Sequence, residues 1–293
     1  MNVDGLIVVD KPAGMTSHDV VARIRRLART RRVGHGGTLD PMATGVLIIG
    51  VNRATRLLTY VIGARKSYAA TIRLGQSTIT DDAEGDVTAT TPTGAVTDEA
   101  IRAGLVAQTG EIDQVPSAVS AIKIKGERAY KRVRDGEQVE LAARRVTVFR
   151  LDVLDIRRGD GVIDVDVEVD CSSGTYIRAI ARDLGATLAV GGHLTALRRT
   201  AVGDLTLADA ATLPELEERA PDVIGLPMSE AARQAFPARE ATEDEARVLS
   251  HGGPLAPVGI QGPYAVFAPT GDVLAIVSER EGRARAEIVL APA

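Results

Sequence analysis

The sequence predicts an α+β fold: a large first domain with a mixed, mainly antiparallel sheet, followed by a small β-rich C-terminal domain. Strand-like and helix-like segments succeed each other without the regular strand–helix–strand rhythm of a doubly wound sheet. Residues 162–170 alternate apolar with acidic side chains, which is typical of an antiparallel strand with one wet face. Four prolines between Pro214 and Pro237 break the pattern, so we place a domain joint near Met228.

The first domain, residues 1–228, contains several short apolar or alternating runs. These predict strands at residues 6–9, 46–49, 66–74, 145–156 and 162–170. Glycine-rich or polar stretches predict loops at 34–45 and 76–86. Helical spacing of apolar residues predicts helices at 17–29, 98–108, 127–134 and 174–188. Thr16 or Ser17 can cap the first of these helices.

The second domain, residues 229–293, is expected to be a small β-rich module. Thr242 can cap a short helix that ends at Leu249. Strands are expected at 264–268, 273–278 and 285–290, the first two joined by a hairpin-type connection.

Composition excludes several classes of protein. The single cysteine, Cys171, excludes an internal disulfide framework and a cysteine-rich metal site. No apolar run approaches about 18 residues and no cleavable leader begins the chain, so we expect a cytoplasmic protein with no membrane partner.

Charge is unevenly distributed along the chain. Residues 1–200 carry 28 Lys and Arg against 24 Asp and Glu, whereas residues 201–293 carry 7 against 15. Residues 23–32 hold six arginines in ten positions. This cluster is either a solvated helix face or a phosphate-binding surface, and arginine favours phosphate because its planar guanidinium matches phosphate oxygens.

Local sequence rules give no unique chemistry. The glycine-rich segment around Asp40 lacks the Gly-Lys-Ser/Thr ending of a P-loop, and no nucleophile elbow is present. The four histidines are scattered rather than spaced as zinc ligands. An aspartate before a proline, such as Asp40, is most often a helix cap or an Asx turn.

Five ordered motifs nevertheless resemble those of the TruB family of tRNA pseudouridine synthases, bacterial type. The central one is VGHGGTLDPMATG at residues 33–45, which contains Asp40. The others are LIVVDKPAGMTS at 6–17, KSY at 66–68 with GQSTITDDAEG at 75–85, QVPSAVSAIK at 114–123, and CSSGTYIRAIARDLG at 171–185 ending with HLTALRR at 193–199. The C-terminal part resembles the family's small RNA-binding, PUA-like domain only in position and character.

The resemblance implies the pseudouridine synthase fold and a reaction without metal or organic cofactor. Asp40 would be the catalytic carboxylate that turns the T-loop uridine at position 55 of tRNA into pseudouridine, by attack on either the base or the sugar. Arg178 would pair with Asp40 and keep it ionised, and Tyr68 would stack on the flipped base. His35 would fill the space that this base vacates.

Further residues in the matched motifs would shape the pocket or contact RNA: Lys11, Asp82, Tyr176 and Lys123. Arg31 and Arg32 would contact phosphates of the tRNA T-arm. We expect a monomer that uses no guide RNA. The sequence departs from the family pattern at Gly36, where threonine is usual, at Ile79, where aspartate is usual, and at Val119, where an aromatic residue is common.

Three other functions remain as alternatives. A non-catalytic RNA-binding protein would explain the arginine cluster, but it would not need Asp40, Tyr68 and Arg178 together. A guide-RNA-dependent relative of the family would carry partner-protein surfaces and a longer C-terminal domain. A nucleoside glycosidase with paired carboxylates would need a second matched acid beside Asp40.

Overall fold

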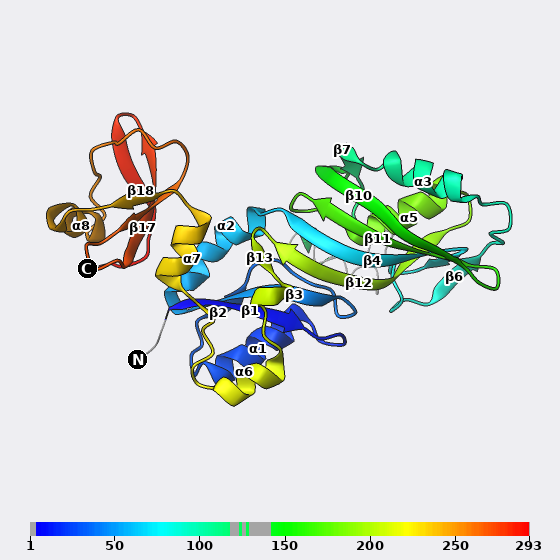
Figure 1. Ribbon diagram of the computed structural model, residues 1–293, viewed down its shortest axis with the longest axis horizontal. Helices are drawn as coiled ribbons and strands as arrows, with labels where there is room; N and C mark the ends of the chain where they lie inside the picture. Colours follow the sequence, from blue (N-terminus) through cyan, green and yellow to red (C-terminus); the bar gives the residue numbers. More distant parts are fainter. Residues whose placement is uncertain (1–3, 118–122, 125–126, 129–141, 293) are drawn as a thin grey trace.

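The protein is elongated, with one long curved sheet and a smaller sheet at one end (Figure 1). The computed structural model describes residues 4–117, 123–124, 127–128 and 142–292. The large sheet has ten strands in the order β14-β1-β3-β12-β4-β11-β10-β7, with β2 paired to β3 and β13 paired to β12. Within it only β3 and β12 run parallel among the described pairs. The predicted mixed, mainly antiparallel sheet is therefore confirmed.

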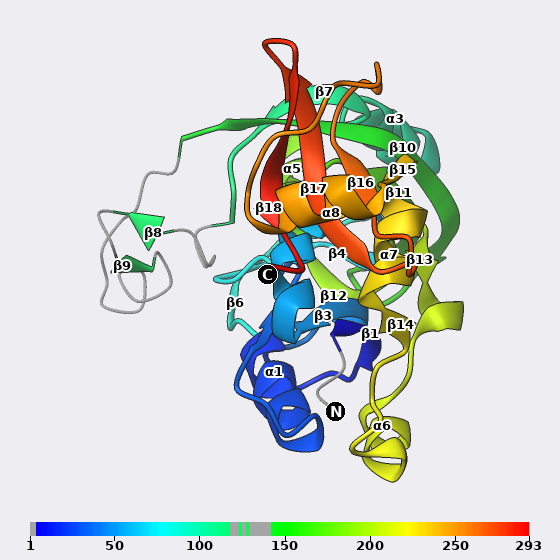
Figure 2. The same ribbon diagram turned by 90° about the vertical axis from the view of Figure 1, so that its left-hand side faces the viewer.

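The strands of the large sheet vary greatly in length. They are β1 (Gly5–Lys11), β2 (Val33–His35), β3 (Thr44–Val51), β4 (Lys66–Leu74), β7 (Gly110–Gln114), β10 (Arg144–Arg158), β11 (Ile163–Cys171), β12 (Gly192–Val202), β13 (Leu205–Thr206) and β14 (Leu226–Pro227). Two small hairpin sheets lie apart from it, formed by β5 (Gln76–Thr78) with β6 (Val87–Thr90) and by β8 (Lys123–Ile124) with β9 (Glu127–Arg128). The second of these lies well to one side of the molecule (Figure 2).

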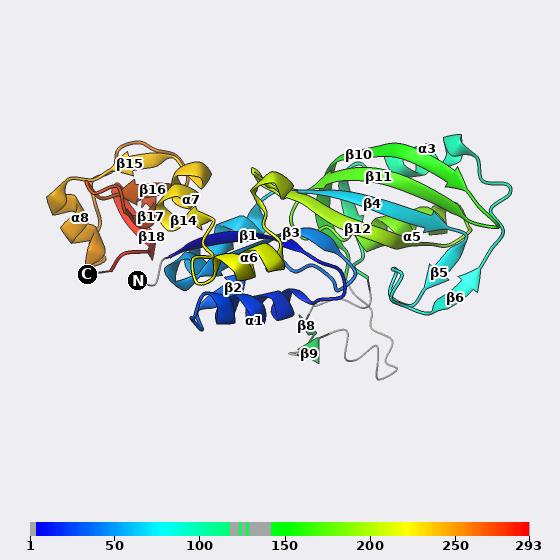
Figure 3. The same ribbon diagram turned by 60° about the horizontal axis from the view of Figure 1, so that its bottom comes forward.

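Helices cover one face of the large sheet in two groups (Figure 3). At one end α1 (Ser17–Leu27) and α6 (Leu213–Arg219) pack on β1 and β3. At the other end α5 (Ile177–Thr187) packs on β12 and β4, and α3 (Asp98–Val106) packs on α5 and β10. Alternate residues of β1 face opposite sides: Ile7 and Val9 contact the first group, whereas Leu6 and Val8 face away from it. None of the described helices has the length and apolarity needed to span a membrane.

The opposite face of β1 and β3 is covered by η1 (Asn52–Leu57), α2 (Leu58–Gly63) and α7 (Met228–Ala235), with η2 (Leu207–Asp209) nearby. Residues of the C-terminal sheet also pack on this face. The smaller sheet then follows, with the order β15-β16-β17-β18. Its elements are β15 (Ala238–Glu240), α8 (Glu243–Ser250), β16 (Tyr264–Phe267), β17 (Val273–Arg280) and β18 (Arg283–Val289).

The start of α1 follows from its sequence. The Thr16 hydroxyl accepts a hydrogen bond from the Asp19 N–H, and the Asp19 carboxylate accepts one from the Thr16 N–H, which is a complete capping box. The buried side of the helix is Val20, Val21 and Ile24, as the spacing predicts. The helix ends at Leu27, two residues earlier than expected, and Arg29 has a positive φ of 50°.

Some sequence expectations are wrong. Residues 33–35, partly inside the expected loop at 34–45, form β2 because pairing with β3 satisfies their backbone groups, and residues 76–78 of the loop expected at 76–86 form β5. The helix expected from 174 begins at Ile177, because Gly174 has a φ of +88° that ends the preceding turn. Residues 127–128 of the helix expected at 127–134 form β9, and residues 129–134 lie outside the described part of the chain.

The other strands and helices are confirmed to within a few residues, including α8 with its Thr242 cap and the strands at 264–268, 273–278 and 285–290. The smaller sheet has its own apolar cluster, around Tyr264 and Val266. Its other face shares a cluster with β1, β3, α2 and α7. The domain boundary at residues 228/229 stays a prediction, and it falls at the first residue of α7.

Candidate active site

Asp40 lies in the loop between β2 and β3, where the two helix-covered halves of the large sheet meet. Main-chain atoms of this loop are held from two sides. The Ser17 hydroxyl, at the start of α1, donates to the Leu39 carbonyl at 3.0 Å and accepts from the Leu39 N–H at 2.8 Å. The Lys11 ammonium donates to the Pro41 carbonyl at 3.2 Å. The backbone next to Asp40 is therefore fixed on either side of the carboxylate.

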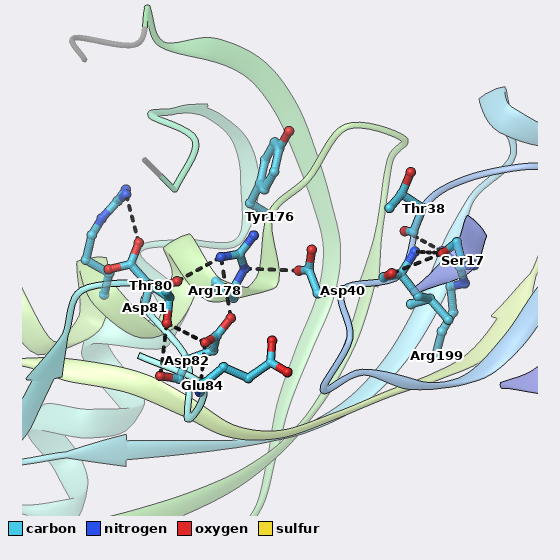
Figure 4. Close-up of polar contacts among 12 residues, drawn as sticks. Ser17, Thr38, Asp40, Thr80, Asp81, Asp82, Glu84, Tyr176, Arg178 and Arg199 are labelled. Carbon is cyan, nitrogen blue, oxygen red and sulfur yellow. Dashed lines mark hydrogen bonds and ion pairs between the residues drawn. The ribbon is translucent and has the colours of Figure 1, made fainter. Parts of the chain in front are cut away.

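The carboxylate of Asp40 faces Arg178, which projects from the first turn of α5 (Figure 4). The Arg178 Nε lies 3.1 Å from the Asp40 Oδ2, and the side chain of Arg178 is only 4% exposed. Its Nη1 donates to the Thr80 carbonyl at 2.8 Å and lies 3.4 Å from the Asp82 Oδ2. Arg178 therefore bridges two carboxylates and a main-chain oxygen, which fixes its guanidinium plane.

Burial raises the pKa of Asp40 above the ordinary value for an aspartate, and the charge of Arg178 acts in the opposite direction. The charge of Asp82 raises the pKa further, and that of Lys11 lowers it. The expected ion pair is present, but it does not overcome the loss of water around the carboxylate. The side chain keeps 37% exposure because one side opens into a pocket.

The pocket beside Asp40 has a volume of about 230 Å³. Among the residues named from the sequence, it brings together Asp40, Tyr68, Tyr176 and Arg178. Tyr68 is 8% exposed, and burial raises the pKa of its hydroxyl, so the phenol stays protonated near neutral pH. The remaining lining is Gly37, Thr38, Leu39, Ile62, Lys66, Ser173, Gly174, Thr175, Ile177, Leu197 and Arg199.

Lys11, Asp82 and His35 are not among the residues that line the pocket. Lys11 is fully buried, its ammonium donates to the carbonyls of Pro12 and Met15 as well as Pro41, and burial lowers its pKa to about 8. Asp82 is 2% exposed and accepts a hydrogen bond from the Glu84 N–H at 3.1 Å. Both side chains hold the walls in place.

His35 ends β2 and packs edge-on against His18 of α1, with ring centroids 5.3 Å apart. Burial lowers the pKa of His35, and the neighbouring His18 lowers it further. Its Nδ1 is buried and has no hydrogen-bond partner within the described residues. A neutral ring with an unused polar atom thus stands next to the loop that carries Asp40.

The arginines of the cluster lie mainly at the surface after α1. Arg31 and Arg32 are exposed, and Arg31 lines a shallow depression of about 560 Å³ with Arg25, Arg26 and Arg29. The spacing of the α1 apolar stripe predicts that Arg23 faces solvent, but its guanidinium pairs with Glu217 of α6. Lys123 lies in β8, whose side chains are outside the described part of the structure.

Sequence reasoning assigned no role to Lys66 or Arg199, although both stand in quoted motifs. Lys66 lies two residues before Tyr68 on β4, so strand alternation places both on one face. Its ammonium donates to the carbonyls of Ile62 and Ala64, both at 2.9 Å, and burial lowers its pKa to about 8. Arg199 comes from β12, a central strand that the sequence analysis did not predict.

The structure shows the environment of two of the three positions that depart from the family pattern, Gly36 and Ile79. A Cβ atom at Gly36 would lie 2.8 Å from Val61 Cγ1 of α2, so the glycine allows α2 to pack closely on the loop. Ile79 is 56% exposed. Val119 lies outside the described residues.

Comparison with protein families gives three matches that together span most of the chain. Residues 25–177 match the TruB family pseudouridylate synthase N-terminal domain. Residues 178–222 match the tRNA pseudouridylate synthase B C-terminal domain, and residues 236–291 match the tRNA pseudouridine synthase II C-terminal region.

Individual relatives are similar over almost their whole length. The tRNA pseudouridine synthase B of Arthrobacter sp. (strain FB24) is 58% identical, covering 99% of this chain and 97% of that protein. The tRNA pseudouridine synthase B of Thermobifida fusca (strain YX) is 56% identical, covering 98% and 99%. Among solved structures, a chain of the archaeal box H/ACA sRNP Nop10–Cbf5 complex is 27% identical with a TM-score of 0.72, covering 98% of this chain and 86% of that chain. The chain belongs to the TruB family of pseudouridylate synthases.

Proposed function

We propose that this protein isomerises the T-loop uridine at position 55 of tRNA to pseudouridine, with Asp40 as the catalytic carboxylate. The observation that carries the proposal is the placement of Asp40, Arg178 and Tyr68 around one pocket. Relatives that are 55–58% identical over nearly the full chain are tRNA pseudouridine synthases B, which supports tRNA as the substrate.

The reaction breaks the bond between N1 of uracil and C1′ of ribose and forms a bond between C5 and C1′. One proton leaves C5 and one is gained at N1, so atoms balance without an oxidant, a reductant or water. An Asp40 oxygen would bond transiently to the sugar or to the base and later leave, which splits the exchange into two smaller steps. Arg178 orients this oxygen, and the dry surroundings make the carboxylate more reactive than it would be in water.

The uridine must leave its stack in the T loop to reach Asp40. Extrusion costs a few kcal/mol, which contacts with the flipped base and the emptied site can offset. The Tyr68 ring lines the pocket and offers a face for stacking, while Tyr176 lies at its wall. His35 would occupy the position that the base vacates, and its buried Nδ1 has no hydrogen-bond partner within the described residues.

Affinity for the T-arm would come mainly from phosphate contacts. Arg31 and Arg32 are exposed and follow the helix that holds the catalytic loop, so RNA bound at Asp40 would pass near them. Lys123 and the β-rich module at residues 229–293 would add contacts further along the tRNA. We expect a monomer that needs no guide RNA.

The guide-RNA-dependent alternative is less well supported. The solved relatives from guide-RNA complexes are 25–27% identical to this chain, whereas the tRNA-specific relatives are 55–58% identical. For the glycosidase alternative, Asp82 is a second carboxylate near Asp40, but Arg178 lies between the two and holds both. No face of Asp82 opens into the pocket to activate water.

The proposal is tested by incubating the purified protein alone with an unmodified tRNA transcript and mapping pseudouridine at single-nucleotide resolution. We expect one product, at position 55, and none in a transcript that has cytidine there. Pseudouridine at another position would contradict the assigned target. Tight binding with no pseudouridine anywhere would favour a non-catalytic RNA-binding protein.

A further inference from the structure

Arg199 has an unusual place in this molecule. It projects from β12 and is only 1% exposed, the largest of the fully buried side chains. Its guanidinium binds main-chain oxygens on two segments. Nε donates to the Val46 carbonyl at 2.7 Å, Nη2 to the Gly37 carbonyl at 3.1 Å and Nη1 to the Thr38 carbonyl at 3.4 Å. One side chain thus connects both ends of the loop that carries Asp40.

The contacts of this guanidinium leave its charge uncompensated. Within the described residues Arg199 forms no ion pair with a carboxylate. A buried cation held only by carbonyl dipoles acts strongly on its neighbours, because little water screens it. Arg199 is the cross-strand partner of Tyr68 of β4, and both residues line the pocket beside Asp40. Burial raises the pKa of the Tyr68 hydroxyl, and the nearby charge of Arg199 opposes that rise.

The backbone around Arg199 has little freedom to move. Gly45 of β3 pairs with Arg199 of β12 in the parallel register, and its φ is +97°. A Cβ atom at Gly45 would lie 2.1 Å from the Arg199 carbonyl oxygen, so only glycine allows the two strands to meet here. The Cα of Arg199 is therefore fixed relative to the start of β3, and its side chain reaches back along the loop to Gly37.

We propose that Arg199 is a positioning residue for the reaction: it fixes the loop that presents Asp40, and it stands beside Tyr68, its cross-strand partner in the same pocket. The inference rests on the proposed function and extends it. Tyr68 lies on β4 and Asp40 lies in the β2–β3 loop. Arg199 binds the main chain of that loop and pairs with Tyr68 across the neighbouring strands. Arg178 sets the direction of the Asp40 carboxylate from the α5 side, and Arg199 sets the position of its backbone from the β12 side.

A purely structural role would give different kinetics. If Arg199 serves only stability, its replacement lowers the melting temperature but leaves the rate unchanged once assays are run well below that temperature. If it positions two reacting groups, the rate of the bound complex falls even in fully folded protein. A misplacement of about 1 Å can cost about a hundredfold in rate.

The test compares Arg199→Lys, which keeps the charge but not the planar fork, with Arg199→Gln, which keeps amide donors without the charge. Single-turnover rates and tRNA dissociation constants are measured on full-length protein, at a temperature where circular dichroism shows each variant folded. We expect a loss of about a hundredfold in rate for Arg199→Lys, a larger loss for Arg199→Gln, and affinity within about threefold of wild type for both.

Arg198→Lys is the matched control. Arg198 neighbours Arg199 on β12 but faces the other way, and its guanidinium pairs with Asp10 at 2.7 Å. Its replacement should leave the single-turnover rate unchanged. A similar loss in Arg198→Lys would show that any change in this strand slows the reaction and would overturn the assignment.

A double variant that combines Arg199→Lys with Tyr68→Phe separates an effect through Tyr68 from an unspecific loss of activity. If Arg199 acts partly through the Tyr68 hydroxyl, the combined loss falls short of the product of the two single losses. Losses that simply multiply, or a folded Arg199→Lys with wild-type rate, would refute the inference while leaving the proposed function intact. Wild-type protein that makes no pseudouridine would instead refute the proposed function itself.

Discussion

At the scale of single residues, the site combines the Asp40 carboxylate with two buried guanidinium groups, Arg178 and Arg199, which differ in their partners. The charge of Arg178 is neutralised by Asp40 and Asp82, so the main effect of this side chain is to orient the Asp40 carboxylate. Arg199 is held by carbonyls and keeps its charge available to Tyr68. Asp40 has a raised pKa despite the adjacent cation, because burial removes the water that would stabilise its negative form.

Replacing Asp40 with asparagine should abolish pseudouridine formation, because an amide cannot provide the transient bond to the nucleoside. Binding of tRNA should stay within about tenfold of wild type, since affinity comes mainly from phosphate contacts. Filter binding and product mapping on the same preparation measure both quantities. A variant that still reacts near the wild-type rate would show that another group is the nucleophile.

Arg178→Ala should lower the single-turnover rate by about a hundredfold or more, because two carboxylates would lose their shared cation in a poorly hydrated site. Arg178→Lys should recover only part of this loss, since an ammonium cannot bind Asp40, Asp82 and the Thr80 carbonyl in one plane. Full activity in the lysine variant would mean that a point charge is sufficient at this position.

At the scale of elements, α1 serves both the fold and the site. Its buried stripe packs on β1 and β3, and its first residue, Ser17, holds the main chain of Leu39. Most arginines of the 23–32 cluster lie at the C-terminal end of α1 or just after it. Arg23 is different, because it forms an ion pair with Glu217 of α6. The helix that holds the loop carrying Asp40 therefore also leads into the exposed arginine cluster.

Changing Arg31 and Arg32 together to alanine should weaken tRNA binding and reduce its salt slope by about one unit for each lost phosphate contact. The complex that forms should still react at the wild-type rate, because neither residue lines the pocket. Affinity measured against salt concentration gives the slope, with Arg102→Ala on α3 as an exposed control. An unchanged slope in the double variant would place the RNA elsewhere and leave this pair without a function.

At the scale of the whole molecule, the two sheets are joined by shared packing. Leu6, Val8 and Ile48 of the large sheet lie in one apolar cluster with Met228 of α7 and Phe267 of β16. The arrangement of the C-terminal module is therefore coupled to β1 and to β3, and β3 begins where the loop that carries Asp40 ends. This coupling would hold any RNA-binding surface of the module at a fixed position relative to Asp40.

Chains that end at residue 227 or at residue 235 test how far this packing extends. Both should be less stable than the full chain, and the shorter one more so, because it also loses Met228, Ala231 and Ala232 from the shared cluster. Each large apolar side chain lost from a buried cluster costs about 2–5 kcal/mol. Melting temperatures and solubility of the three proteins give their order of stability. Equal stability of the two truncated chains would place α7 with the second domain and support the boundary at 228/229.

The sequence by itself determined the class of the fold, most of the elements and the residues around the carboxylate. Local sequence signals were sufficient to predict the type of element wherever a segment follows one periodicity. Examples are β11, whose faces alternate, and α1, which begins with a capping box. The motif around Asp40 indicated the family, and the structure then placed Asp40, Tyr68, Tyr176 and Arg178 around one pocket.

Tertiary structure alone decided what those residues contact. β2 and β5 form in segments with weak strand signals because distant strands pair with them, and β12 lies at the centre of the sheet although its sequence gave no clear prediction. The roles of Lys66 and Arg199 depend on carbonyl groups brought close by strand pairing and by the Gly45 contact. The balance that raises the pKa of Asp40 is likewise set by burial, which depends on the packing of segments far apart in the chain.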